Sequence, residues 1–167
     1  SLALSHHGLR ALGVPQDSLD SFPLEFQEGM AARAEYIGDV GESGPANWEP
    51  PFGTPNLHVA LTALGPDEAR LEEKLAHARA SFAAVPGLQV IWSHEVKQLP
   101  NGRGFFGFRD GLSYPSIEGV GIVGSNPQEP PLKAGEFLLG YPDESGDIAP
   151  MPQPEILGRN GTYLAFR

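Results

Sequence analysis

The sequence predicts an α+β fold, with an antiparallel sheet and helices on one side of it. Two observations carry this prediction. A long amphipathic helix is expected over residues 66–85, and segments with strand periodicity flank it at 57–64 and 88–96. With 167 residues, 40% of them hydrophobic, the chain is also long enough to bury a core of its own.

Short helices are expected before the first of these strands. Ser5 is a suitable N-cap for a helix that carries Leu9 and Leu12 on one face, and Gly13 ends it. A second helix is expected to open at Pro23, because apolar side chains recur there at steps of four residues: Phe22, Phe26 and Met30.

The centre of the chain has a strand–helix–strand pattern. The first strand alternates through Leu57, Val59 and Leu61, and the second places Val90 and Trp92 on one face. The helix between them has one apolar stripe at spacings of four, three and four residues: Leu71, Leu75, Ala78 and Phe82.

Two segments rich in Gly and Pro are predicted to be loops, at 38–56 and over most of 97–160. A connection as long as the second one is usually functional or wrapped around another group. The last residues, 161–167, alternate again and are predicted to form a strand.

Composition excludes several classes of function. The net charge is −10 and no basic cluster exists, so a nucleic-acid or anionic-membrane surface is not expected. The chain has no cysteine, which removes disulfides, thiolate metal ligands and a cysteine nucleophile. No apolar run reaches the roughly 18 residues of a membrane-spanning helix.

Histidines and acidic residues give no metal pattern. The five histidines show no His-Glu-x-x-His spacing, and hydrogen-bonded or solvated structural histidines are the favoured interpretation. Asp143, Glu144 and Asp147 lie near Gly146 but fail the spacing of a calcium loop, so this segment is interpreted as a solvated turn.

The segment GFRDGLSYP at 107–115 is the strongest candidate for chemistry. It places Asp110 between Gly107 and Gly111, directly after an apolar run. Glycines allow the backbone to approach a flat ligand closely, so the acid could transfer protons beside such a ligand. The alternative is an ordinary turn, because Asp-Gly is a common turn dipeptide.

Five segments together resemble the dye-decolourising peroxidase family. They are GLRALG at 8–13, FQEGM at 26–30, GFRDGLSYP at 107–115, GEFLLGY at 135–141 and LGRNGTYL at 157–164. The third contains the Gly-x-x-Asp-Gly motif of that family. The resemblance covers nearly the whole chain in the family's order.

The resemblance implies a haem-dependent peroxidase that reduces hydrogen peroxide and oxidises bulky organic reductants such as dyes. Asp110 would be the distal acid that takes a proton from peroxide and returns it to the outer oxygen. Gly111, Leu112 and Ser113 would line the distal face of haem b. Tyr114 and Tyr163 could pass electrons from substrates, although packed aromatic side chains are the favoured interpretation.

The resemblance also implies that the chain is part of a larger protein. The proximal histidine that ligates iron and the arginine partner of the aspartate are expected beyond Arg167, so the chain itself holds no metal ligand. The fragment alone is then expected to be inactive, with the missing C-terminal half as its partner and a homo-oligomer as a further assembly. A first strand is expected before Ser1.

The implied domain organisation has three parts. Residues 1–100 would form a ferredoxin-like domain, 101–155 a distal haem-side loop and linker, and 156–167 the first strand of a second ferredoxin-like domain. A hypothesis of a different class stays open: a non-catalytic ferredoxin-like binding module without haem.

Overall fold

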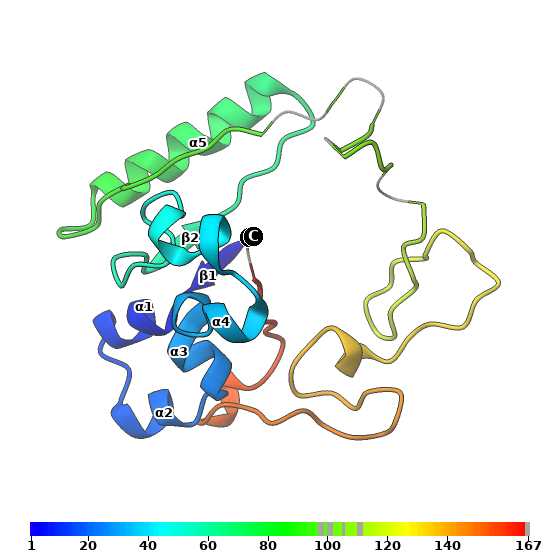
Figure 1. Ribbon diagram of the computed structural model, residues 1–167. Coiled ribbons are helices and arrows are strands. Elements are labelled where there is room, and N and C mark those ends of the chain that lie inside the picture. Colours follow the sequence, from blue (N-terminus) through cyan, green and yellow to red (C-terminus); the bar gives the residue numbers. More distant parts are fainter. Residues whose placement is uncertain (97–98, 100–101, 105, 110–111, 166–167) are drawn as a thin grey trace. The chain divides into compact units, whose positions relative to one another are not determined.

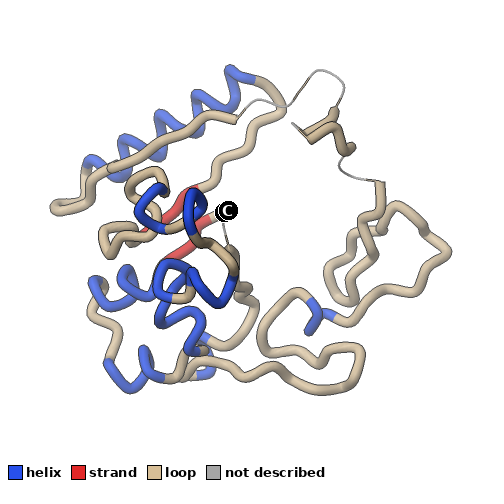
Figure 2. The backbone as a smooth tube through the Cα atoms, in the orientation of Figure 1, coloured by secondary structure: helices blue, strands red, loops and turns tan. Residues whose placement is uncertain are grey.

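The computed structural model describes residues 1–96, 99, 102–104, 106–109 and 112–165. It divides into two compact units, which are described separately below. Unit 1 comprises Ser1–Asp20 and Leu24–His94, and unit 2 comprises Ser21–Pro23 and Glu95–Arg167. In the chain trace of Figure 2, the helices and strands belong mostly to unit 1, whereas the described part of unit 2 is largely loop.

The sheet of unit 1 has two antiparallel strands, β1 (Leu2–Leu4) and β2 (Val59–Leu61), with Leu2 opposite Leu61. Backbone hydrogen bonds extend the pairing at both ends, from Thr62 N to Ser1 O and from Ser5 N to His58 O. β2 lies inside the strand predicted at 57–64. β1 was not predicted, because three residues are too few to show a period.

Unit 1 also has four short helices (Figure 1): α1 (His6–Ala11), α2 (Gln16–Asp20), α3 (Leu24–Ala32) and α4 (Ala34–Ile37). α1 contacts β1, α2 and α3, and α3 contacts α4. The predicted cap of α1 is confirmed, since the Ser5 hydroxyl accepts a hydrogen bond from Gly8 N at 2.9 Å. α1 also lies against the ribbon: a Cβ on Gly8 would stand 2.1 Å from His58 O. The buried apolar side chains here are Leu9, Leu19 and Ala34.

The helix predicted to open at Pro23 is α3, but it is broken. Gly29 adopts φ 73° and ψ 172°, which is not helical, so the apolar spacing of four residues does not continue through Met30 on one straight helix. Glycine tolerates this conformation without a Cβ clash. The N-terminal part of α3 faces α1, where the Phe26 ring meets the edge of the buried His6 ring at 6.0 Å.

The helix predicted over 66–85 is α5 (Glu68–Ala83). The Asp67 carboxylate caps it by accepting a hydrogen bond from Arg70 N at 2.8 Å. The predicted stripe is the less exposed side of the helix: Leu71, Leu75, Ala78 and Phe82 are half-buried while almost all other positions are exposed. No residue of α5 is fully buried, so the stripe is only partly covered.

The strand predicted at 88–96 is not a strand in this structure. After α5 the chain turns and runs back as an extended segment (green in Figure 1), and its residues form no ladder. Alternation identifies a chain that suits a sheet, but pairing also needs a neighbouring strand, and the sheet of the described residues ends at β1 and β2.

Unit 2 contains two short 3-10 helices, η3 (Ala134–Glu136) and η4 (Glu155–Leu157), and isolated bridges rather than a sheet among its described residues. The loop character predicted over most of 97–160 therefore agrees with the described residues of that range. Of the strand predicted at 161–167, residues 161–165 form no ladder, and 166–167 lie outside the described residues. The α+β class predicted for the chain is confirmed by the helices and the antiparallel ribbon of unit 1.

Candidate functional site

The segment before Asp110 is a small hairpin. Arg103 and Arg109 form an antiparallel bridge, and Gly104 N donates to Phe108 O at 2.8 Å. Gly107 closes the turn with φ 84°, a conformation that favours glycine. The Arg103 guanidinium donates to Gly107 O at 2.6 Å and reinforces the turn. The hairpin fixes the backbone up to the residue that precedes Asp110.

The segment after Asp110 is anchored a second time, at Tyr114. Tyr114 N donates to the Ser125 hydroxyl at 3.0 Å, and Ser125 N donates to Tyr114 O at 2.7 Å. Ser116 accepts twice, at its hydroxyl from Gly124 N and at its carbonyl from Leu132 N. The backbone of Gly124 approaches that of Tyr114 too closely for a side chain at position 124, because a Cβ there would lie 2.4 Å from Tyr114 O.

We call residues 102–125 the motif loop. In the sequence, Asp110 stands between the hairpin and the Tyr114 anchor. Asp110 and Gly111 themselves lie outside the described residues. Leu112 and Ser113 are both exposed. The turn interpretation and the acid interpretation of Asp110 both stay predictions.

Several large apolar side chains among the described residues of the motif loop are exposed. Phe106 is 93% exposed, Phe108 77%, and Leu112 and Tyr114 65% each. The part of the chain after Tyr114 also has a cavity of about 340 Å³, lined by residues 116–119, 121–123 and Pro131. The loop thus offers apolar surface for a large ligand or another part of a protein.

The histidines support the structural interpretation where the structure describes contacts. His6 is buried, with Nε2 3.4 Å from Leu19 O, and His94 stacks on Trp92 with ring centroids 5.7 Å apart. The described residues contain no group of three side chains able to hold a metal ion. All five histidines belong to unit 1, whereas the motif loop belongs to unit 2.

The acidic segment at 143–147 is a turn, as interpreted from its spacing. The Asp143 carboxylate accepts hydrogen bonds from Ser145 N at 2.8 Å and from Asp147 N at 3.0 Å. An aspartate that bonds to the backbone of its own turn stabilises that turn without any ion.

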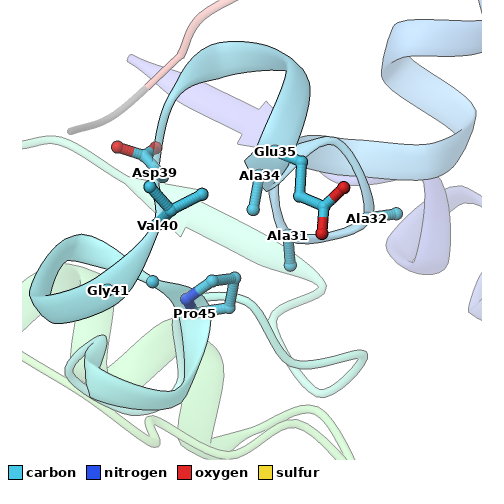
Figure 3. Close-up of a pocket in the computed structure, with 9 residues that line it drawn as sticks. Ala31, Ala32, Ala34, Glu35, Asp39, Val40, Gly41 and Pro45 are labelled. Carbon is cyan, nitrogen blue, oxygen red and sulfur yellow. The ribbon is translucent and has the colours of Figure 1, made fainter.

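Unit 1 has a cavity of about 500 Å³ beside the end of α4, lined mostly by Ala, Gly and Pro within residues 31–45 (Figure 3). Its two carboxylates, Glu35 and Asp39, point away from each other in Figure 3. Asp39 is only 4% exposed, whereas Glu35 faces solvent. Because the two acids do not converge, the cavity has no paired-carboxylate site.

Two of the segments that resemble the peroxidase family meet in unit 2. Leu139 N donates to Gly161 O at 2.8 Å, and Asn160 N donates to Leu139 O at 3.1 Å. The Tyr141 hydroxyl donates to Asn160 Oδ1 at 2.6 Å, and the Arg159 guanidinium lies 5.8 Å from the centre of the Tyr141 ring. We call these contacts between 139–141 and 159–161 the Tyr141 clasp.

Some residues that hold the site together were not found from the sequence. The side chains of Ser116, Ser125 and Arg103 anchor the motif loop by hydrogen bonds to backbone groups. Such contacts follow no period or spacing, and a serine in a Gly-rich loop gives no signal of its partner.

Comparison with known proteins identifies the protein family of the chain. Residues 1–93 match the family model described as the DyP dimeric alpha+beta barrel domain. The chain belongs to the dye-decolourising peroxidase family, and the resemblance found in the sequence is confirmed.

No helix among the described residues is both long and apolar enough to span a membrane.

Curated relatives match over the whole chain. A dye-decolorizing peroxidase from Mycena epipterygia is 31% identical over 173 residues, covering 100% of this chain and 30% of the relative. Peroxidase 2 from Mycetinis scorodonius is 32% identical over 172 residues, covering 100% and 31%. A dye-decolorizing peroxidase from Exidia glandulosa is 28% identical, with the same coverage as the second. The chain thus spans about three tenths of the length of these relatives.

Proposed function

We propose that this chain supplies the distal side of a haem peroxidase site, in which Asp110 acts as acid and base toward hydrogen peroxide. The observation that carries the proposal is the position of the Asp110 motif. It lies between a hairpin and the Tyr114–Ser125 anchor, within a loop that exposes Phe106, Phe108 and Leu112. The printed names of the relatives, dye-decolorizing peroxidase and peroxidase, support the same activity.

The motif loop fits one face of a haem group. A macrocycle is flat and largely apolar, and the exposed aromatic and aliphatic side chains of the loop offer matching surface. Gly111, Leu112 and Ser113 would line this face, with glycine allowing close approach of the backbone. The iron-ligating histidine is proposed to come from the remainder of a longer protein, together with an arginine that partners Asp110.

Haem b, when bound, would supply the redox-active iron at which the O–O bond of peroxide is cleaved. Asp110 would take the proton from the inner peroxide oxygen and deliver it to the outer one, so that the outer oxygen leaves as water. An organic reductant supplies the two electrons of the overall reaction, in which one peroxide and two protons become two water molecules. Reach and orientation of the carboxylate matter most for such a transfer.

The test uses the chain joined to the C-terminal remainder encoded by its own gene, loaded with haem. Replacement of Asp110→Asn removes the transferable proton but keeps the side-chain shape. We expect the rate of peroxide reduction to fall by about 10²–10⁴-fold, the usual contribution of a general acid–base group. The Soret absorbance, which reports bound haem, should remain.

Asp143→Asn is the matched control, because it makes the same chemical change in a turn of the same unit. It should leave the peroxide rate unchanged. An Asp110→Asn rate equal to that of the control would remove Asp110 from the mechanism. A joined protein without a Soret band would instead reject the haem site and favour the non-catalytic binding module.

A further inference from the structure

The acidic turn at 143–147 makes a contact outside itself. Asp143 bonds to the backbone of its own turn, whereas the Glu144 carboxylate accepts a hydrogen bond from Lys133 N at 2.6 Å. In return, Glu144 N donates to Glu136 Oε1 at 3.0 Å. Hydrogen bonds to an ionised carboxylate are roughly twice as strong as those between neutral groups. We call these two bonds of Glu144 the Glu144 staple.

The backbones that the Glu144 staple joins also touch. Gly135 N donates to Pro142 O at 3.0 Å, and a Cβ on Gly135 would lie only 2.3 Å from Tyr141 O. An approach this close is open to glycine alone. Tyr141 also belongs to the Tyr141 clasp, so the staple and the clasp fix the same stretch of backbone. The acidic turn thus has a defined position relative to residues 133–136.

The peptide group between Leu132 and Lys133 links the Glu144 staple to the motif loop. Its N–H donates to the Glu144 carboxylate, and its carbonyl, Leu132 O, accepts from Glu118 N at 2.9 Å. In a trans peptide such as this one, the N–H and the carbonyl point in opposite directions. One rigid plane therefore has the Glu144 carboxylate at one edge and the motif loop at the other. A bond at one edge polarises the peptide group and strengthens the bond at the other.

The bonds at Leu132 continue into the anchors of the motif loop. Leu132 N donates to Ser116 O at 2.9 Å, and the Ser116 hydroxyl accepts from Gly124 N at 2.8 Å. Gly124 precedes Ser125, which pairs with Tyr114 through two hydrogen bonds. A continuous series of hydrogen bonds thus runs from the acidic turn to the segment that follows the Asp-Gly motif.

Of the two carboxylates bonded to Lys133, Glu144 provides the stronger constraint. The Lys133 ammonium pairs with Glu118 at 3.1 Å, but the two side chains are 48% and 58% exposed, and exposed ion pairs contribute little. Glu144 bonds instead to a backbone N–H, so it constrains the main chain and not only a flexible side chain.

We propose that Glu144 is a positioning residue for peroxide reduction. Through the 132–133 peptide group it holds the part of the motif loop that follows Asp110 in the sequence, and so fixes the orientation in which Asp110 meets peroxide. This role rests on the proposed function of Asp110, and Glu144 itself transfers no proton. A misplacement of reacting groups by about 1 Å can cost about 10²-fold in rate, so a hydrogen bond far from the chemistry can affect it.

The first measurement needs no haem. In the haem-free protein, joined to the C-terminal remainder encoded by its own gene, Glu144→Ala should speed backbone hydrogen exchange at Glu118 and Ser125 at least about threefold. Glu144→Gln keeps an acceptor oxygen at the same reach and should retain most of the protection. Mass spectrometry of peptides that cover 114–125 measures both variants. Unchanged exchange in Glu144→Ala would overturn the proposal.

The second measurement is the rate of peroxide reduction by the haem-loaded protein. Glu144→Ala should slow it about tenfold and leave the Soret absorbance in place, whereas Glu144→Gln should stay within about twofold of the parent. Added to Asp110→Asn, Glu144→Ala should change the rate less than about twofold, because it acts through Asp110, whereas independent residues would multiply their effects. Glu129→Ala is the matched control. It removes the same charge from unit 2, where the Glu129 carboxylate accepts from the Asn126 side chain at 3.0 Å, and it should leave the rate unchanged.

The outcomes distinguish the two proposals. Asp110→Asn at the parent rate would reject the proposed function, and the positioning role with it. A slow Asp110→Asn beside Glu144→Ala at the parent rate, or beside effects that multiply, would overturn the positioning role alone. Loss of the Soret band in Glu144→Ala would also overturn it, since the residue would then act on haem binding.

Discussion

Unit 1 and unit 2 are each stabilised internally, and by different kinds of contact. Unit 1 has helices, a strand pair and a small buried core at Leu9, Leu19 and Ala34. The described part of unit 2 has turns and short 3-10 helices fixed by individual hydrogen bonds, such as those of Arg103 and Tyr141. Substitutions in unit 1 should therefore change global stability, while those in unit 2 should act locally, around the candidate site.

The largest effect is expected in the core of unit 1. Leu19→Ala removes a side chain that is 1% exposed and should lower the free energy of unfolding by about 2–5 kcal/mol. Urea denaturation followed by circular dichroism measures it. The same change at the half-buried Leu75 of α5 should cost roughly 1 kcal/mol, because less apolar surface returns to water there. Equal losses at the two leucines would contradict the view that α5 packs weakly.

The contrast between the units also explains what the sequence could predict. The first helix and α5 were found because caps and apolar periods are local signals: Ser5 caps one and the stripe through Leu75 marks the other. The strand predicted at 88–96 was wrong. Hydrophobic alternation is a property of one segment, whereas a β-ladder also requires a neighbouring strand. The break at Gly29 followed no period either.

The candidate site was found from the sequence by its motif, not by its geometry. Spacing and order placed Asp110 in a family segment, and the family is confirmed. The contacts that anchor the motif loop, through Ser116 and Ser125, join residues that no pattern relates. Loops of this kind are fixed by individual hydrogen bonds between residues that are separated in the sequence. These partners are known only once the folded structure is known.

An intermediate effect is expected at the Tyr141 clasp. Tyr141→Phe removes the hydrogen bond to Asn160 Oδ1 and should cost about 1 kcal/mol, the usual net value of such a bond. Because the change is local, the amides of Leu139 and Asn160 should exchange hydrogen faster, while those of α1 keep their protection. Hydrogen exchange read by NMR measures both.

Tyr114→Phe is the control for the clasp, since its side chain is 65% exposed and its ring stays in place. It should leave the exchange of Leu139 and Asn160 unaltered. If Tyr141→Phe exposed the amides of α1 as much as those of the clasp, the two units would not respond separately and the comparison would break down.

The smallest effect is expected at Tyr163, a partly buried phenol of unit 2. Burial raises the pKa of Tyr163 above its ordinary value of 10.0, because it disfavours the phenolate. The neutral phenol is thus favoured in the folded state, and its contribution to stability is complete below pH 10 and lost as pH rises through the raised pKa. The ultraviolet titration of the parent chain should contain a phenol ionisation displaced above pH 10 that is absent in Tyr163→Phe. The variant should also lose less stability than the parent chain above pH 10. An unchanged titration curve would show that the Tyr163 phenol is solvated.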